Sequence, residues 1–367
     1  MIRFDHVTKS YPGGTTAVAD LTLEAPTGHT TVLVGPSGCG KTTSLRMINR
    51  MIEATSGTIS IDGHDVASMN PVELRRGIGY VIQAAGLFPH RTIVDNVSTV
   101  PLLLGWPKDK ARRRSMELIE RVGLDPGLAN RYPHQLSGGQ QQRVGVARAL
   151  AADPPIMLLD EPFSAVDPVV RAELQDEFLR LKSEFGKTTV FVTHDIDEAI
   201  TVGDQIAVLR GGGRLAQFAP PSALLSRPAD DFVAGFVGRD RGYRALGLRH
   251  VQLSVCPEPT VRAAAGTFPA AGSGTPAELG GWIVAVDEAD RPTGWVAAGD
   301  GPGRQHLGGT LATPGGSLRQ ALDAVLSSPS GRGVVVDEEG RFAGTVTVDT
   351  VLAAIDRDRA GEEDDTP

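Results

Sequence analysis

A glycine-rich loop between an apolar run and a helical stretch limits this chain to few folds. Residues 30–42 read TTVLVGPSGCGKT, and the helical pattern KTTSLRMINRM begins at residue 41. Glycines in this context let successive backbone N–H groups face phosphate oxygens, and the helix start adds its positive dipole end. The pattern predicts a nucleotide phosphate loop at the end of a buried strand. A glycine turn before an ordinary helix is the alternative reading.

The phosphate loop supplies the first set of candidate binding residues for ATP or GTP. They are Gly35, Pro36, Ser37, Gly38, Cys39, Gly40, Lys41, Thr42 and Thr43. Lys41 is placed to reach the β and γ phosphates, and the Thr42 hydroxyl to bind Mg²⁺. Cys39 lies at the expected helix start, where a thiolate is stabilised. We therefore expect a reactive Cys39 thiol that bound nucleotide protects.

Composition excludes several classes of protein. At 367 residues and 41% apolar content, the chain can bury one full core and a smaller second one. Its net charge of −8 offers no basic field, so we expect no nucleic-acid partner. Two cysteines are too few for a disulfide framework, and the start MIRFDHVTKSYPGG lacks a signal-peptide pattern. No apolar run reaches 18 residues, so any membrane role is expected to be peripheral.

The first 235 residues alternate apolar runs with helical stretches. The runs are TTVLVG (30–35), IMLLD (156–160), TVFVTH (189–194) and QIAVLR (205–210). Short continuous apolar runs of this kind are typical of buried strands in a largely parallel sheet. We predict an α/β core with helices on both faces. Residues 84–150 show weak strand signals, so we predict a mostly helical insert there.

Two further motifs carry chemistry. Asp160 ends an apolar strand and Glu161 follows at once, so one carboxylate can serve Mg²⁺ and the other can polarise an attacking water. A solvated turn is the alternative for this pair. Residues 136–143 read LSGGQQQR, a second glycine pair introduced by a serine at an expected helix start. A simple serine N-cap is the alternative there.

These motifs, in this order, resemble the ATP-binding cassette (ABC) ATPases over residues 2–235. The resemblance implies a P-loop NTPase cassette, with a RecA-like core and a helical subdomain at about 84–150. It also implies a head-to-tail dimer with a second copy, in which LSGGQ covers the ATP held by the other phosphate loop. In that arrangement Ser137, Gly138, Gly139 and Gln140 bind the partner's nucleotide.

The resemblance assigns roles to other residues one at a time. Tyr11 matches the aromatic that stacks on adenine, and Gln83 matches a glutamine that joins the Mg²⁺ ligands Thr42 and Asp160. Asp167 matches the loop that crosses the dimer interface, although Val166 replaces the usual leucine. Glu161 and His194 match the catalytic pair, with His194 at the γ-phosphate.

The segments GLFPHRTIVDNVSTVPLLLGWP and THDIDEAI look like those of importer ATPases for glycine betaine, proline betaine, choline and related osmoprotectants. That likeness implies a separate transmembrane permease and, indirectly, a solute-binding protein. It places the chain at the cytoplasmic face of a bacterial membrane. An importer ATPase for another small zwitterionic or amino-acid-like solute, and a non-transport ABC ATPase, remain alternatives.

The C-terminal region has a different texture. We predict a basic linker at 236–250, a repeat domain at 251–355 and an acidic disordered tail at 356–367. Residues 281–296 and 332–348 superpose at an offset of 50, and we expect short helices at 260–265 and 317–326. The repeats resemble tandem cystathionine-β-synthase-type (CBS) domains, an α+β regulatory module. Neither copy has the full pattern of adenosine-binding members: Ala297 replaces the expected hydroxyl residue in the first copy, and Thr350 replaces the expected aspartate in the second.

Charge suggests a role for this region. Acidic residues of the tail oppose the arginines of the linker: Asp356, Asp358, Glu362, Glu363, Asp364 and Asp365 against Arg239, Arg241, Arg244 and Arg249. The two groups could attract each other, the arginines could contact anionic lipid headgroups, or both could simply be solvated. The first two interactions weaken as salt rises. If such contacts restrain transport at low salt, we expect the activity to rise as the salt concentration increases.

Overall fold

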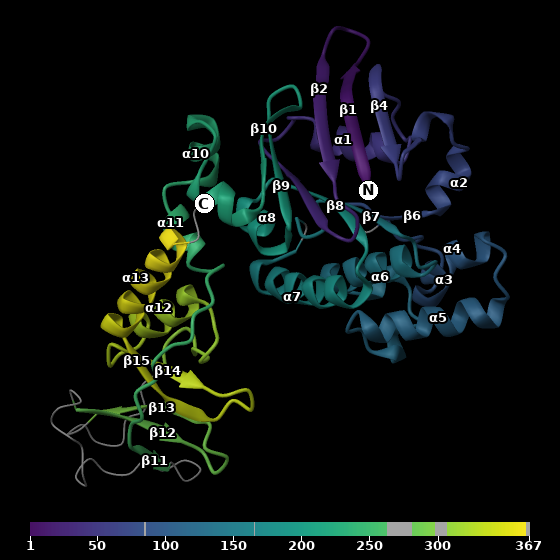
Figure 1. The fold of residues 1–367 in the computed structure, drawn as a ribbon. Coiled ribbons are helices and arrows are strands. Elements are labelled where there is room, and N and C mark those ends of the chain that lie inside the picture. Colours follow the sequence, from purple (N-terminus) through teal and green to yellow (C-terminus); the bar gives the residue numbers. More distant parts are fainter. Residues whose placement is uncertain (84–85, 165, 263–280, 298–306, 365–367) are drawn as a thin grey trace. The chain divides into compact units, whose positions relative to one another are not determined.

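The fold is described from a computed structural model, for residues 1–83, 86–164, 166–262, 281–297 and 307–364. The chain divides into two compact units, Met1–Arg239 and Asp240–Pro367. The first unit contains the phosphate loop and the second contains the repeats (Figure 1). Each unit has hydrophobic clusters of its own.

A six-stranded sheet forms the centre of the first unit. In spatial order its strands are β10 (Arg214–Ala219), β9 (Gln205–Arg210), β3 (Thr30–Val34), β8 (Thr188–Thr193), β7 (Ile156–Asp160) and β6 (Ile78–Val81). All neighbours are parallel except β10, which runs antiparallel to β9. Every residue of β3, β7 and β8 is buried, which explains their continuous apolar runs. The predicted α/β core is confirmed.

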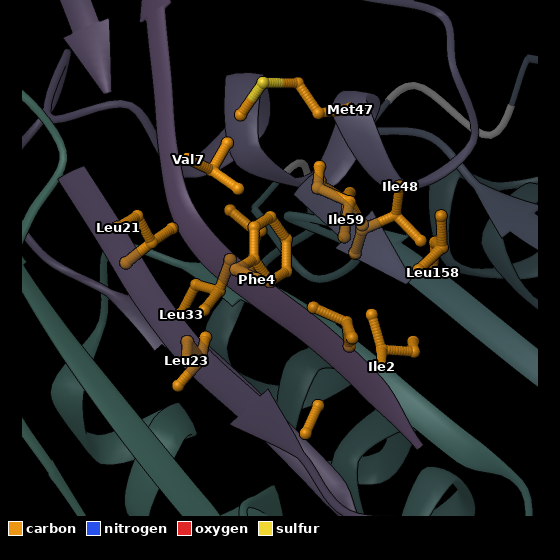
Figure 2. Packing of buried hydrophobic residues seen from close by; sticks show 14 of the residues in the cluster. Ile2, Phe4, Val7, Leu21, Leu23, Leu33, Met47, Ile48, Ile59 and Leu158 are labelled. Carbon is orange, nitrogen blue, oxygen red and sulfur yellow. The ribbon is translucent and has the colours of Figure 1, made fainter. Parts of the chain in front are cut away.

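A second, antiparallel sheet covers one side of this core, and the sequence did not predict it. Its strands, in spatial order, are β2 (Thr16–Ala25), β1 (Ile2–Ser10), β4 (Ser56–Ile61) and β5 (His64–Asp65). Ile2 and Phe4 point inward while Arg3 and Asp5 are exposed, as period-two patterning requires. Figure 2 shows the inward side chains packed with those of the central sheet and of the helix after the phosphate loop.

Helices surround the two sheets. Those outside the insert are α1 (Lys41–Ile48), α2 (Pro71–Arg76), α7 (Pro168–Phe185), α8 (Ile196–Val202), α9 (Pro221–Ser226) and α10 (Asp231–Val237), with the short turn η1 (Val66–Ser68). The insert holds α3 (Ile93–Val97), α4 (Thr99–Leu103), α5 (Lys108–Arg121), η2 (Pro126–Leu128), η3 (Pro133–Gln135) and α6 (Gly138–Leu150). No strand occurs in the described part of 84–150, so this part of the cassette is helical.

The second unit repeats one hairpin. Its strands are β11 (Thr260–Arg262), β12 (Trp282–Val286), β13 (Pro292–Ala297), β14 (Arg332–Val336) and β15 (Phe342–Thr347). The pairs β12–β13 and β14–β15 have a bulge at the same place, before Val286 and before Val336. In the two turns, Asp287 and Asp337 each accept a backbone N–H at 2.8 Å, from Arg291 and from Arg341. The predicted internal repeat is therefore present as structure.

The helix expected at 260–265 is wrong where the structure describes it. Residues 260–262 form β11, which runs parallel to β12, and 263–265 lie outside the described residues. The β-branched Thr260 and Val261 suit a strand, and pairing with β12 supplies the hydrogen bonds that a short helix lacks. The other expected helix is confirmed as α12 (Leu318–Leu326), capped by Ser317.

Helical structure extends into both charged segments of the second unit. The linker contains α11 (Arg241–Ala245), in which Arg244 pairs with Asp240 at 3.3 Å. The tail predicted to be disordered spans residues 356–367. Residues 356–364 of that tail lie in α13 (Val348–Asp364). Val351 is buried in the first turns of α13, and this packing supplies the nucleus from which the helix can propagate. Residues 365–367 lie outside the described part of the chain.

Candidate nucleotide-binding site

The phosphate loop joins β3 to α1, and its shape depends on glycine. Gly35 and Gly40 have φ values of 155° and 97°. A Cβ on Gly40 would collide with the carbonyl oxygen of Ala17. The exposed stretch from Pro36 to Gly38 lies between these two positions. Only glycine satisfies both the backbone conformation and the space at Gly40.

Lys41 begins α1 and folds back over this loop. Its side chain is 5% exposed, and Nζ donates to the carbonyl oxygens of Gly35 at 2.7 Å and Pro36 at 3.0 Å. An ammonium group is therefore held at the loop, beside the first backbone N–H groups of a helix. This combination favours a polyphosphate.

Asp160 lies beside the phosphate loop, at the carboxyl end of β7. One carboxylate oxygen accepts the Thr42 hydroxyl at 2.8 Å, and the other lies 3.4 Å from the Tyr80 hydroxyl and 3.6 Å from the guanidinium of Arg46. Asp160 is 4% exposed, so its carboxylate is held in one orientation. The structure thus brings together two of the three predicted metal ligands. A hydroxyl and a carboxylate are oxygen donors of the kind that Mg²⁺ prefers.

The third predicted ligand, Gln83, belongs to a neighbouring cluster. Its amide lies 3.3 Å from both Glu161 Oε2 and Ser164 Oγ. Glu161 Oε2 is also 3.1 Å from His194 Nδ1, so the two predicted catalytic residues are in contact. Glu161 has a φ of 47°, a strained conformation for a residue other than glycine, and its N–H donates to Val192 at 3.0 Å.

The LSGGQ segment begins α6. The Ser137 hydroxyl accepts the backbone N–H of Gln140 at 3.2 Å, and the Gln140 side chain accepts that of Ser137 at 3.0 Å. The bond to the Ser137 hydroxyl is the one that a simple serine N-cap requires, and the bond to the Gln140 side chain completes a capping box. Among the described residues, Ser137, Gly138, Gly139 and Gln140 make no hydrogen bond to the phosphate loop. Their predicted role in binding a partner's nucleotide stays a prediction.

Two other predicted binding residues lie at exposed positions. Tyr11, after β1, is 38% exposed, with Lys9 Nζ 5.2 Å from its ring centre. Asp167 caps α7 by accepting the N–H groups of Val169 and Val170, both at 3.1 Å. An exposed ring suits stacking on a base, and an exposed cap suits a contact between two copies of a chain.

Cys39 differs from expectation. Its side chain is 2% exposed, and α1 begins at Lys41 with Gly40 as its cap, so Cys39 precedes the helix. Burial raises the pKa of the Cys39 thiol more than the neighbouring Lys41 ammonium lowers it. A buried, protonated thiol is a poor nucleophile. The expectation of a reactive Cys39 is therefore not supported.

We predict that Cys39 in the folded protein reacts with iodoacetamide at least about tenfold more slowly than the exposed Cys256. The thiolate fraction at neutral pH is small because the Cys39 pKa is raised, so its rate should climb as pH increases toward that pKa. Mass spectrometry of labelled peptides would measure both sites, with urea-unfolded protein as the reference. Equal labelling of the two cysteines in the folded chain would contradict this.

Some residues of the site were not found from the sequence. Arg46 and Tyr80 contact Asp160, and Ser164 contacts Gln83. Arg46 is four residues after Thr42 on α1, a spacing that places both on one helix face, so a helical reading could have suggested it. No comparable signal marks Tyr80, because its contact depends on the pairing of β6 with β7.

Comparison with known proteins agrees with this geometry. The family model described as "ABC transporter" matches residues 18–164. The glycine betaine/carnitine/choline transport ATP-binding protein OpuCA of Bacillus subtilis is 52% identical over 241 residues, which cover 66% of this chain and 63% of that protein. The chain thus spans less than two thirds of that relative's length. The osmoprotectant import ATP-binding protein OsmV of Salmonella typhimurium is 41% identical over 96% of this chain and 95% of its own.

Solved structures agree as well. A dimeric ATP-binding cassette in a post-hydrolysis state, bound to ADP and Pi, is 35% identical, with a TM-score of 0.55 over 60% of this chain and 99% of that one. In the described residues, no helix combines the length and the apolar character needed to span a bilayer. Because the likeness to OsmV extends over nearly the full length of both proteins, this chain belongs to the ATP-binding proteins of the ABC transporter family.

Proposed function

We propose that the chain is the ATP-hydrolysing subunit of an ABC importer, which powers uptake of a betaine-type osmoprotectant through a separate permease. The observation that carries this proposal is the arrangement of two clusters at neighbouring strand ends. Thr42 and Asp160 lie next to the phosphate loop, and Glu161 contacts His194. Ligands of α/β proteins bind at this edge of a sheet. The names of the relatives support the solute class.

In this proposal the phosphate loop and Lys41 bind the phosphates of ATP, and Tyr11 stacks on adenine. Thr42, Asp160 and Gln83 would hold Mg²⁺, whose charge would offset that of the phosphates. The Thr42–Asp160 hydrogen bond orients both oxygen donors in advance. Arg46 limits how far the Asp160 carboxylate can rotate.

Glu161 would polarise the attacking water, and His194 would contact the γ-phosphate. Their contact at 3.1 Å keeps both side chains at the same edge of the sheet. The amide of Gln83 restricts the Glu161 carboxylate from another side. The segments after β6, β7 and β8 therefore contribute to one small polar cluster that holds the proposed general base in place.

The proposed partners follow from the family. A second copy would place Ser137, Gly138, Gly139, Gln140 and Asp167 over the nucleotide of the first, because helix N-termini attract phosphate. A transmembrane permease would hold the dimer peripherally at the cytoplasmic face of the membrane. A solute-binding protein would act on the permease, not on this chain directly.

Uptake of labelled glycine betaine and choline in a deletion strain tests the proposal. Loss of uptake, restored by the parent chain but not by Glu161→Gln, is the expected result. If the deletion strain still takes up betaine and choline but no longer takes up another zwitterion, that zwitterion would replace betaine as the proposed solute. Unchanged uptake of every solute would favour a non-transport ABC ATPase.

We further propose that the second unit is a CBS-like regulatory module that responds to ionic strength. Its hairpins repeat at an offset of 50, and acidic and basic segments lie at its two ends. Thr347 caps α13 by accepting the N–H of Thr350 at 3.3 Å, so this pair has a structural use that needs no adenosine ligand.

When the chain is reconstituted with its permease in anionic lipid, its ATPase activity should rise with salt. The reason is that the exposed charge contacts proposed to restrain activity weaken as the Debye length falls from about 10 Å at 0.1 M to about 3 Å at 1 M. Truncation after residue 239, where the first unit ends, should flatten the response. Neutral lipid is the control for headgroup contacts. A truncated chain with the full response would exclude this role.

A further inference from the structure

Glu198 on α8 is a buried carboxylate that the proposed chemistry does not use. It is 5% exposed, and its Oε2 accepts the Thr193 hydroxyl at 2.6 Å. The same Thr193 oxygen accepts the backbone N–H of Asp195 at 3.0 Å. Glu198 therefore fixes, through Thr193, the residues on either side of His194.

The other oxygen of Glu198 faces Arg171 in the first turns of α7. Arg171 Nε lies 3.9 Å from Glu198 Oε1, and among the described residues this buried nitrogen has no hydrogen-bond partner. Another nitrogen of the same guanidinium donates to the carbonyl of Val166 at 3.3 Å. Arg171 therefore joins Glu198 to the loop that carries Asp167.

Ser164, near Val166 in the sequence, contacts Glu161 of the proposed catalytic pair Glu161 and His194. The Ser164 hydroxyl donates to the Glu161 carbonyl at 2.9 Å, and the Glu161 carboxylate lies 3.1 Å from His194. One set of contacts thus links Thr193, Glu198, Arg171 and Val166, with a separation of 3.9 Å between Glu198 and Arg171. A second set links Ser164, Glu161 and His194.

We propose that Glu198 and Arg171 are positioning residues that couple Val166 and Asp167 to Thr193 and His194 during ATP hydrolysis. This inference rests on the proposed function. The separation of 3.9 Å is too long for a hydrogen bond, yet Glu198 and the Nε atom of Arg171 are buried and the two groups are oppositely charged. In this proposal, a small shift of Arg171 toward α8 brings its Nε within hydrogen-bond distance of Glu198. Because Glu198 holds Thr193, the shift is transmitted to the backbone beside His194.

Arg171 also affects the ionisation of Glu198. Desolvation raises the pKa of Glu198, the Thr193 hydroxyl and the Arg171 charge lower it, and Asp195 raises it further. The Arg171 charge is thus one of the contacts that favour the ionised form of Glu198. The purely structural alternative is that the pair only holds α7 against α8.

A double-mutant cycle in the purified full-length chain separates these two roles. Glu198→Gln keeps an acceptor for Thr193 but removes the charge, and Arg171→Met removes the cation. We expect each variant to lower kcat by roughly 3- to 30-fold, with the ATP dissociation constant changed by less than about twofold. The double variant should be no slower than the slower single variant. Asp176→Asn, an exposed position on α7, should match the parent and is the control.

A change in thermal midpoint with kcat per folded molecule unchanged would overturn the inference, and so would additive losses in the cycle. If Glu198→Gln does not fold, Thr193→Val and Thr193→Ser repeat the test, with kcat lost in the first and kept in the second. Equal kcat values for these two would also overturn it. An inactive parent chain would overturn the proposed function together with this inference. An active parent with unchanged variants would overturn only the inference.

Discussion

Glu161→Gln should slow ATP turnover by a factor between about 10² and 10⁴ while leaving ATP binding intact. The amide has nearly the same shape as the carboxylate but cannot accept a proton from water. Its neighbours Gln83 and His194 retain a partner oxygen, so the cluster should keep its geometry. Steady-state phosphate release and binding of a fluorescent ATP analogue would measure the two quantities separately.

The same variant should accumulate an ATP-bound dimer, since the nucleotide that joins the two copies persists. Size-exclusion chromatography with light scattering would detect the dimer at saturating MgATP. Glu173→Gln is a suitable control, because this carboxylate is 62% exposed and lies outside the cluster. Near-normal turnover by pure Glu161→Gln would remove Glu161 from its proposed role.

Lys41→Met should weaken ATP binding by roughly two orders of magnitude, because charge-assisted hydrogen bonds to phosphate are about twice as strong as neutral ones. In the parent chain, the ammonium group is held over the loop by the carbonyl oxygens of Gly35 and Pro36. It is therefore already ordered where phosphates would bind. Titration with ATP by isothermal calorimetry would measure the loss.

Lys187→Met is the matched control for Lys41→Met. Lys187 is also largely buried and ion-paired, at 2.6 Å from Asp153, but it lies outside the nucleotide cluster. Both variants should unfold within a few degrees of the parent, so that a binding loss in one of them is specific. Equal ATP affinity in the Lys41 variant and the control would contradict the assigned role.

Elements defined by local pattern were predicted well from the sequence. The strands β3, β7, β8 and β9 are short apolar runs whose burial follows from their position in a parallel sheet. The antiparallel sheet was missed because its pattern is interrupted. In β1, the pairing shifts between Phe4 and Val7, where His6 has a φ of 48°, so inward positions stop alternating regularly.

The residues of the candidate site also fall into two groups, those that a local motif indicates and those that only the tertiary fold brings together. Motif residues such as Lys41 and Asp160 were chosen as candidates from the sequence because their spacing reflects chemistry along one segment. Residues that act through tertiary contact were not, since Glu198 and Arg171 meet only after α7 and α8 pack together. The state of Cys39 was also mispredicted from its place near a helix start, because burial depends on the whole fold.

Glu161 has a left-handed backbone conformation, which lowers the stability of the fold. Selection for ATP turnover and selection for stability therefore favour different residues at this position. A side chain in this conformation costs on the order of 1 kcal/mol relative to glycine, and the role in hydrolysis that we propose for Glu161 is a reason to keep it. Glu161→Gln retains that cost, whereas glycine would relieve it. A descendant that binds ATP without hydrolysing it would therefore be free to drift toward glycine at this position and become more stable.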